Sequence, residues 1–281
     1  MPEDGAAASE RKGLKDSVEH DNVRDHWNEN ADLWTKLARA GYDVYRDHLN
    51  TPAFFEMLPD VDGLRGLDIG CGEGHNTRLL ANRGGEVTAV DLSDVFVWHA
   101  QRLEEQDRLG IDYQVANAVA LPFADRAFDF ATGFMSFMDI PETDRVLAEA
   151  YRVLRPGGFL QFSVTHPCFD TPHRRILRSR DGLIRAIEVG DYFRNLQGEI
   201  VAWIFGAVPK EDRKHMPKFK IPRFTRTLSQ WLNLVIDAGF VLERVGEPQP
   251  SDELVRERPY LQDAQVVAYF LHVLARKPGS V

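Results

Sequence analysis

The 281-residue chain is poor in cysteine and has no long hydrophobic run. Its two cysteines, Cys71 and Cys168, are too few for a disulfide framework and lack the spacing of a zinc site. The longest apolar run, Val266 to Ala275, is interrupted by His272 and is far too short to span a bilayer. We therefore expect a cytoplasmic protein with no membrane partner and no bound metal.

The chain also lacks an excess of positive charge, since its formal net charge is −9. That balance argues against broad binding to nucleic acid or to anionic membranes by the protein as a whole. Residues 1–20 mix charges of both signs around no apolar segment, so we expect a flexible tail and no signal peptide. Hydrophobic residues make up 43% of the chain, which is enough for a substantial globular core.

The most informative stretch runs from Arg65 to Asp91. A short apolar run is followed by alternate glycines, a helical pattern and a second apolar run that ends in Asp91. The order strand, glycine-rich turn, helix, strand is half of a nucleotide-binding α/β unit. Glycines allow unusual backbone dihedrals and let a ligand lie against bare backbone. An acid at the end of the second strand can accept both hydroxyls of a ribose.

The spacing of the glycines does not match a dinucleotide-binding turn, whose third glycine follows the second by three residues. Here the interval is two, and Asp68 precedes the first glycine by two positions. This pattern resembles the cofactor loop of class I S-adenosylmethionine-dependent methyltransferases, in particular the type 11-like group. The resemblance implies S-adenosyl-L-methionine as cofactor, S-adenosyl-L-homocysteine as product, and the following cofactor-binding residues: Asp68, Gly70, Cys71, Gly72, Gly74, Asp91, Leu92, Asn117, Ala118 and Met135.

Further landmarks of that family follow in the same order. The turn at 121–123, the strand at 128–134 and the Leu154-Arg155-Pro156-Gly157-Gly158 turn all match. Asn117 departs from the family, which has an acid beside the adenine, but an amide oxygen can also accept a hydrogen bond from an amine. The segment 134–139 lacks the Asn/Asp-Pro-Pro-aromatic sequence typical of enzymes that methylate DNA bases. We therefore expect no DNA substrate.

The predicted architecture is a Rossmann-like, doubly wound α/β fold. Residues 61–165 and 227–281 form its core, a seven-stranded sheet with helices on both faces and an antiparallel last strand at 265–276. Ser93 and Thr227 are the expected caps of two of its helices. Residues 21–60 form a helical segment that covers the cofactor, with Thr51 capping a helix that starts at Pro52. Arg46 or one of the aromatic rings of this segment is expected to line the site.

Residues 166–226 interrupt the α/β alternation and are long for a plain connection, so we expect a lid that selects the acceptor. Between 173 and 226 there are 13 Lys and Arg against 6 Asp and Glu. This basic character fits either a solvated surface or a lid for a polar or anionic substrate. It also leaves open an RNA methyltransferase, whose binding would weaken steeply with salt. A third possibility is a non-catalytic protein that keeps the fold for cofactor binding or regulation.

Methyl transfer to an oxygen or to a protonated amine requires a base. His166 directly follows the fifth strand, where ligands of such sheets bind, and imidazole can accept a proton near neutral pH. The alternative is that His166 only holds the bend before Pro167. Asp139, His173 and Tyr192 are weaker candidates, and His75 is expected near the methionine end of the cofactor. The sequence thus predicts methylation of an oxygen or nitrogen of a small molecule, and it does not determine the oligomeric state.

Overall fold

The computed structural model describes residues 20–279. The tail expected over residues 1–20 lies outside this range except for His20, the first residue of helix α1 (His20–Arg39). Helix α1 ends where Gly41 adopts a positive φ of 80°. The chain then continues through η1 (Arg46–Asn50) and α2 (Thr51–Met57) into the first strand.

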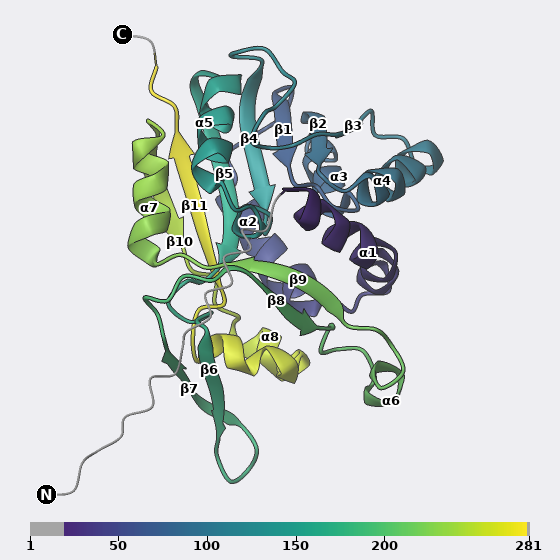
Figure 1. Ribbon diagram of the computed structural model, residues 1–281, viewed down its shortest axis with the longest axis vertical. Coiled ribbons are helices and arrows are strands. Elements are labelled where there is room, and N and C mark those ends of the chain that lie inside the picture. The colour runs from purple at the N-terminus through teal and green to yellow at the C-terminus, as the bar shows by residue number, and fades with distance from the viewer. Residues whose placement is uncertain (1–19, 280–281) are drawn as a thin grey trace, which may run out of the picture.

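A seven-stranded sheet forms the centre of the molecule (Figure 1). In spatial order its strands are β10 (Val241–Gly246), β11 (Phe270–Arg276), β5 (Leu154–Thr165), β4 (Phe128–Phe134), β1 (Arg65–Ile69), β2 (Glu86–Asp91) and β3 (Asp112–Val115). The pairs from β3 to β5 are parallel, whereas β11 is antiparallel to both β5 and β10. The predicted sheet with an antiparallel last strand is confirmed.

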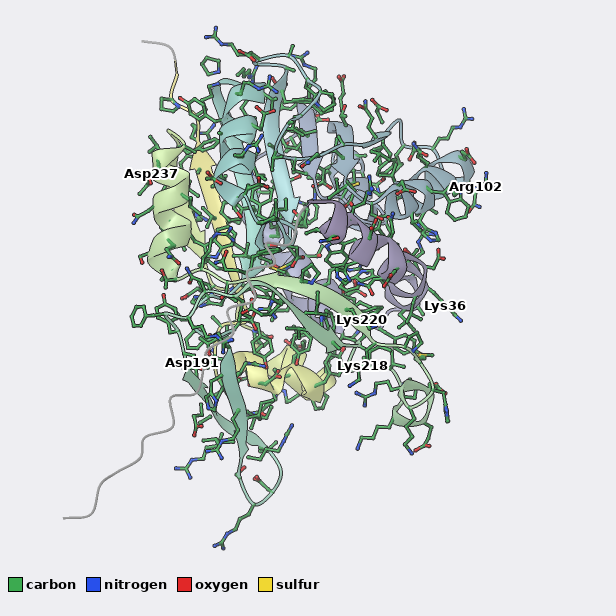
Figure 2. All side chains as sticks on the ribbon, viewed as in Figure 1. Lys36, Arg102, Asp191, Lys218, Lys220 and Asp237 are labelled. Carbon is green, nitrogen blue, oxygen red and sulfur yellow. The ribbon has the colours of Figure 1, made fainter. Side chains whose placement is uncertain are left out.

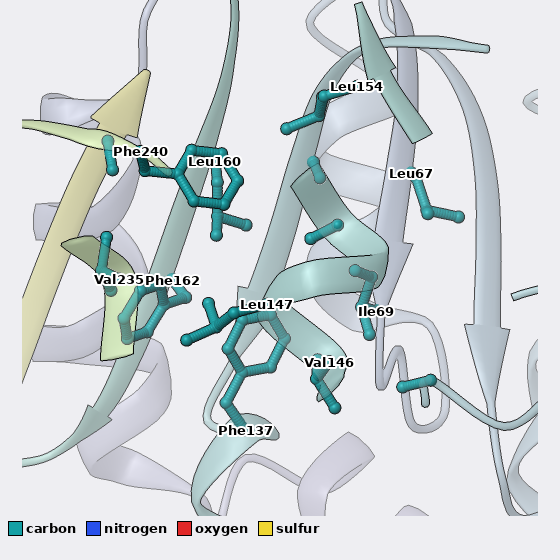
Figure 3. Close-up of a cluster of buried hydrophobic side chains, with 14 of the residues drawn as sticks. Leu67, Ile69, Phe137, Val146, Leu147, Leu154, Leu160, Phe162, Val235 and Phe240 are labelled. Atoms are coloured by element: carbon teal, nitrogen blue, oxygen red, sulfur yellow. The ribbon is translucent and has the colours of Figure 1, made fainter. Parts of the chain in front are cut away.

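Successive side chains of a strand point to opposite faces of the sheet, and apolar side chains on both faces are covered by helices. On one face, Leu67, Leu160 and their neighbours pack against α5 (Thr143–Val153) and α7 (Leu228–Asp237), as Figure 3 shows. On the other face, alternate residues such as Phe130 pack against α2, α3 (His75–Ala81) and α4 (Asp94–Gln106). The two clusters fix the strands so that their carboxyl ends meet at one edge.

The helix caps follow the sequence prediction in two of three cases. The Ser93 hydroxyl accepts a hydrogen bond from the backbone N–H of Phe96, and Thr227 forms a capping box with Gln230. The predicted cap at Thr51 is wrong, because the preceding residue, Asn50, is itself helical and α2 continues directly from η1. The Thr51 hydroxyl instead donates to Asn76 Oδ1 at 2.9 Å.

The segment 166–226 forms two separate antiparallel hairpins. One pairs β6 (His173–Arg178) with β7 (Ile184–Gly190), and the other pairs β8 (Gln197–Trp203) with β9 (Phe219–Phe224), with the short helix α6 (Lys210–Arg213) between its strands. Strand β9 contacts both α1 and η2 (Phe137–Asp139), the turn that follows β4. In Figure 1, the β8–β9 hairpin crosses below the ends of β4 and β5. We call α1 and this hairpin the roof.

The roof is held together by aromatic rings from distant parts of the chain. Trp34 of α1 lies 4.9 Å from both Phe205 and Phe219, measured between ring centroids, and 5.5 Å from Trp203. Leu37 and Ala38 of α1 belong to the same buried cluster. Helix α1 of the segment before the core and the β8–β9 hairpin of the segment expected to be a lid therefore form one packed unit.

The last strand is shorter than predicted, because it begins at Phe270 and not at Gln265. Residues Pro259–Gln265 form the 3₁₀ turn η3, after the short helix α8 (Asp252–Glu257). The backbone N–H groups of Val266 and Val267 both point back to the carbonyl of Asp263, which keeps these apolar residues out of the sheet.

Candidate functional site

The glycine loop after β1 has the backbone that the sequence predicts. Gly70, Gly72 and Gly74 have φ values of 77°, 55° and 87°, a region that favours glycine. A Cβ atom on Gly70 would lie 2.3 Å from the Cβ of Ser136, whereas one on Gly72 would meet nothing within 4 Å. Gly70 is therefore required by the close approach of the segment after β4, and Gly72 leaves its side of the loop open.

Asp91 connects the end of β2 to this loop. Its Oδ2 accepts a hydrogen bond from the backbone N–H of Gly72 at 2.8 Å, and its Oδ1 accepts one from Ser93 N–H at 2.9 Å. Burial raises the pKa of this carboxyl, and the backbone N–H donors of Ser93, Gly72 and Leu92 oppose that shift. Each carboxylate oxygen can accept a further hydrogen bond. The geometry fits a carboxylate that receives two vicinal hydroxyls.

Asp68 lies beneath the loop. Only 1% of its surface is exposed, and its two oxygens accept hydrogen bonds from the hydroxyls of Thr77, at 2.6 Å, and Thr132, at 2.8 Å. Burial raises its pKa to about 6, against these two hydrogen bonds. Asp68 thus links β1 to α3 and β4, so it supports the loop from behind.

Two further predicted residues follow the ends of β3 and β4, on either side of β1 and β2 in the sheet. The Oδ1 of Asn117, after β3, accepts a hydrogen bond from its own turn, the N–H of Val119 at 3.1 Å. Met135, directly after β4, has a positive φ of 52°, and its N–H donates to the carbonyl of Ser163 on β5. A non-glycine residue in this region stores backbone strain of the kind that gathers at functional sites. Both residues therefore lie at the sheet edge that the glycine loop occupies.

The remaining predicted cofactor-binding residues lie close to the same strand ends. Leu92 and Cys71 are partly buried at the ends of β2 and β1, and Ala118 is buried in the turn after β3. Burial raises the pKa of the Cys71 thiol well above its usual range, so this cysteine stays a neutral side chain. The structure thus brings all ten predicted residues to the ends of four adjacent strands.

Both ring nitrogens of His166 are already occupied. Its Nδ1 accepts the N–H of Cys168 at 3.2 Å, and its Nε2 lies 2.6 Å from Glu247 Oε1. Because Nδ1 is the acceptor, the proton lies on Nε2 and points to the carboxylate. The His166 carbonyl also accepts the N–H groups of Phe169 and Asp170. This geometry favours the bend over the base, because the ring has no free nitrogen for an acceptor.

A charged cluster at the loop was only partly anticipated. The sequence singled out Arg46, but not Glu73 between the glycines, which binds it with Arg46 Nη1 2.9 Å from Glu73 Oε1. Arg46 Nε also lies 2.8 Å from Asp47 Oδ1. Burial raises the pKa of nearby Asp43 to about 6 despite the charge of Arg46. A buried acid within the glycine loop was the available signal for an arginine partner.

Two kinds of feature are absent from residues 20–279. Within that range, no group of three or more His, Cys, Asp or Glu side chains is arranged to hold a metal ion. No helix of the described chain is long and apolar enough to cross a membrane.

Comparison with known proteins agrees with the geometry. Residues 67–162 match the family described as "Methyltransferase domain". A malonyl-[acyl-carrier protein] O-methyltransferase of Pectobacterium atrosepticum is 35% identical over 45% of this chain and 49% of its own length. A demethylmenaquinone methyltransferase of Renibacterium salmoninarum is 34% identical over 46% of this chain and 56% of its own. The chain thus spans about half the length of the curated relatives it matches.

Solved structures extend the similarity to most of the fold. An S-adenosylmethionine-dependent methyltransferase from Mesorhizobium loti superimposes with a TM-score of 0.65 at 28% identity, over 80% of this chain and 96% of the other. A second structure, from Listeria monocytogenes, has the same TM-score at 23% identity and supports the fold alone. The family match contains the glycine loop, Asp91 and Asn117, but neither the roof nor His166.

Proposed function

We propose that this chain, which contains a methyltransferase domain of the class I, S-adenosylmethionine-dependent type, transfers a methyl group from S-adenosyl-L-methionine to an oxygen or nitrogen of a small-molecule acceptor. The observation that carries the proposal is the link between Asp91 and the N–H of Gly72. It joins the acid at the end of β2 to an open glycine loop at the end of β1.

The residues present fit this cofactor. Asp91 would receive the ribose hydroxyls, the open side of Gly72 would leave room against the loop backbone, and Asn117 would meet the adenine. Because Asn117 Oδ1 already serves Val119 N–H, its amide N–H₂ is the group left to donate to a ring nitrogen. The cofactor supplies an activated methyl group with its leaving group attached.

The protein then contributes mainly alignment and exclusion of water. Fixing two reactants in an in-line geometry contributes about 7–11 kcal/mol of barrier lowering. We infer that α1 and the β8–β9 hairpin, packed together in the roof, close the cofactor site on the acceptor's side. Ring contacts such as that between Trp34 and Phe219 would make α1 and the β8–β9 hairpin move as one unit.

A small acceptor is favoured over RNA by the charge of the protein and by the names of its relatives. The net charge is −9, and two further relatives are named a fatty-acid O-methyltransferase and a ubiquinone biosynthesis O-methyltransferase. Lys36 of α1 and Lys218 and Lys220 of the β8–β9 hairpin, labelled in Figure 2, are exposed positive charges of the roof. If RNA were the substrate, replacing these lysines by alanine would weaken RNA binding and reduce its salt dependence.

The test is calorimetric titration of the purified protein with S-adenosylmethionine, repeated on Asp91→Ala. We expect binding by the unmodified protein and loss of at least about 100-fold in affinity in the variant, since two hydrogen bonds to a charged group are lost. Asp112→Ala is the matched control, because Asp112 lies at the start of β3, on the opposite edge of the sheet. Equal binding by both variants would contradict the assignment of Asp91.

Product formation distinguishes a methyltransferase from a non-catalytic binding protein. Incubation with S-adenosylmethionine and a mixture of phenols, fatty acids and quinols should release S-adenosylhomocysteine, detected by mass spectrometry. Binding without any such release would support a binding or regulatory role.

A further inference from the structure

One buried acid at the same edge of the sheet has no partner. Asp139 ends η2, four residues after the strained Met135, and its side chain is only 8% exposed. Within residues 20–279, its carboxylate makes no hydrogen bond or ion pair. Neither oxygen is among the fully enclosed unpartnered atoms, so the carboxylate keeps a small accessible area. Buried carboxylates are normally paired, so this one requires an explanation.

The charges around Asp139 place it between the cofactor half and the roof. It interacts with Arg223 of β9 and with Asp170, which follows β5, on the roof side, and with Asp91 on the cofactor side. Arg223 does not neutralise it, because its Nη2 pairs with Asp170. Strand β5 and helix α5, which also pack against η2, bring no charged group to it in the described part of the chain.

The other two acids described at this edge already have hydrogen-bond donors within the protein. Both oxygens of Asp68 and both of Asp91 accept hydrogen bonds within the protein, and His166 has no free ring nitrogen. Compared with Asp68 and Asp91, Asp139 combines burial, the lack of a hydrogen-bond donor and a position between the two halves of the site.

We propose that Asp139 is the catalytic base: its carboxylate binds the O–H or N–H group of the acceptor and takes up the proton as the methyl group is transferred. This assignment rests on the proposed methyltransferase function. The acceptor oxygen or nitrogen forms a bond to the methyl carbon while the sulfur–methyl bond breaks. The bonding pair stays on sulfur, and the proton passes from the acceptor to a carboxylate oxygen of Asp139.

The ionisation of Asp139 suits this role. Burial raises its pKa to about 7, Arg223 lowers it, and Asp170 and Asp91 raise it. A base whose pKa lies near the working pH is the most effective proton acceptor. The positive sulfonium of the cofactor would favour the charged carboxylate and so prepare the base when the cofactor binds.

Proton release on cofactor binding tests the assignment without an identified acceptor. S-Adenosylmethionine and S-adenosylhomocysteine are titrated at pH 7 in phosphate, HEPES and Tris, which differ in ionisation enthalpy. If the sulfonium lowers the pKa of Asp139 by about one unit, the first ligand releases about 0.4 proton more than the second. Asp139→Asn should abolish that difference, weaken the binding of S-adenosylmethionine by about fivefold because the charge pair is lost, and keep the affinity for S-adenosylhomocysteine within about threefold. A difference that persists in Asp139→Asn overturns the proposal.

Thermal unfolding tests the assignment of Asp139 without any ligand. Asp139→Asn should raise Tm most at pH 8, where the unpaired carboxylate is charged, and by less at pH 5, where only the unfolded carboxylate is ionised. Asp129→Asn is the matched control, since Asp129 is 7% exposed but pairs with Arg155 at 2.9 Å and should lose stability. A loss of Tm in Asp139→Asn at both pH values would identify a structural carboxylate and overturn the proposal.

The two proposals fail in different ways. Absence of S-adenosylmethionine binding by the unmodified, folded protein would overturn the methyltransferase assignment and Asp139 with it. Binding that depends on Asp91, together with proton release that does not depend on Asp139, would overturn only the base.

Discussion

The cofactor half and the acceptor half of the site differ in how their polar groups are satisfied. At the glycine loop, the carboxylates of Asp68 and Asp91 accept hydrogen bonds from the loop itself, from α3 and from β4. On the acceptor side, Asp139 is buried and free. The comparison indicates that the loop is complete before any ligand arrives, whereas the acceptor half has an unmet hydrogen-bonding requirement that a substrate can satisfy.

The halves also differ in how the chain builds them. The loop and its acid come from one continuous stretch, Arg65 to Asp91. The proposed acceptor half joins η2, the bend at His166 and strand β9. Strand β9 contacts η2, and the aromatic cluster around Trp34 packs β9 against α1. Substitutions should therefore have local effects in the first half and distributed effects in the second.

The largest effect is expected for Gly70→Ala, which attacks the loop itself. The added methyl would lie 2.3 Å from Ser136 Cβ in a backbone with φ of 77°, and we expect a loss of more than about 3 kcal/mol in the free energy of unfolding. Gly72→Ala is the control, because its methyl meets open space and should cost only about 1–2 kcal/mol while impairing cofactor binding. Chemical denaturation and calorimetry measure both. Equal stability losses would contradict the distinction between the two glycines.

The next effect concerns the anchor of the N-terminal helices on the sheet. His272 of β11 is 1% exposed and lies, through Nε2, 2.6 Å from Asn50 Oδ1, and burial lowers its pKa to about 4. Its folded pKa is below the unfolded value, so the unfolded chain binds more protons between pH 6.5 and 4. Stability therefore falls as pH falls through this window, by up to roughly 3 kcal/mol.

His272→Gln should remove that contribution, because glutamine keeps an N–H donor and does not titrate. Denaturation of both proteins at pH 7 and pH 4.5 measures the change. Asp68 and Asp139, with raised pKa values, act in the opposite direction and are present in both proteins, so they cancel in the comparison. Identical pH profiles would show that His272 does not contribute.

A smaller effect is expected for Trp34→Ala in the roof. Trp34 contacts three rings of the β8–β9 region but is only partly buried. We therefore expect a loss of about 2 kcal/mol in the free energy of unfolding, together with weaker binding and faster dissociation of S-adenosylhomocysteine. Trp98→Ala, at an exposed position of α4, should change stability by less than about 0.5 kcal/mol. If the two variants behaved alike, the roof would not be a cooperative unit.

The smallest effect is expected for Glu247→Gln, which tests the role of His166. Glutamine can still accept the Nε2–H of His166, and Glu247 is more than half exposed, so stability should change by less than about 1 kcal/mol. Once an acceptor is known, its turnover should keep the same pH profile if His166 holds the bend. A displaced pH profile in this variant would instead restore His166 as the base.

Much of the cofactor half was predictable from sequence because its determinants are local. Glycine spacing, the acid at the end of an apolar run and the cap at Ser93 each depend on a few neighbouring residues. The errors have equally physical causes. Thr51 was read as a cap, but tertiary packing keeps Asn50 helical. The apolar residues at 266–267 suggested a strand, but η3 turns them back towards Asp263.

Sequence alone was therefore sufficient for the order of strands and helices in the seven-stranded core, the antiparallel last strand and the loop that suits S-adenosylmethionine, since periodicity and glycine placement act over short distances. Only the tertiary structure decided the acceptor half. Whether His166 is a free base or a bonded bend depends on Glu247, 81 residues away in the chain. Asp139 is left without an ion pair because Arg223 pairs with Asp170 instead. Such choices arise from charges and rings that meet only after folding, when burial sets the cost of leaving a group unpaired.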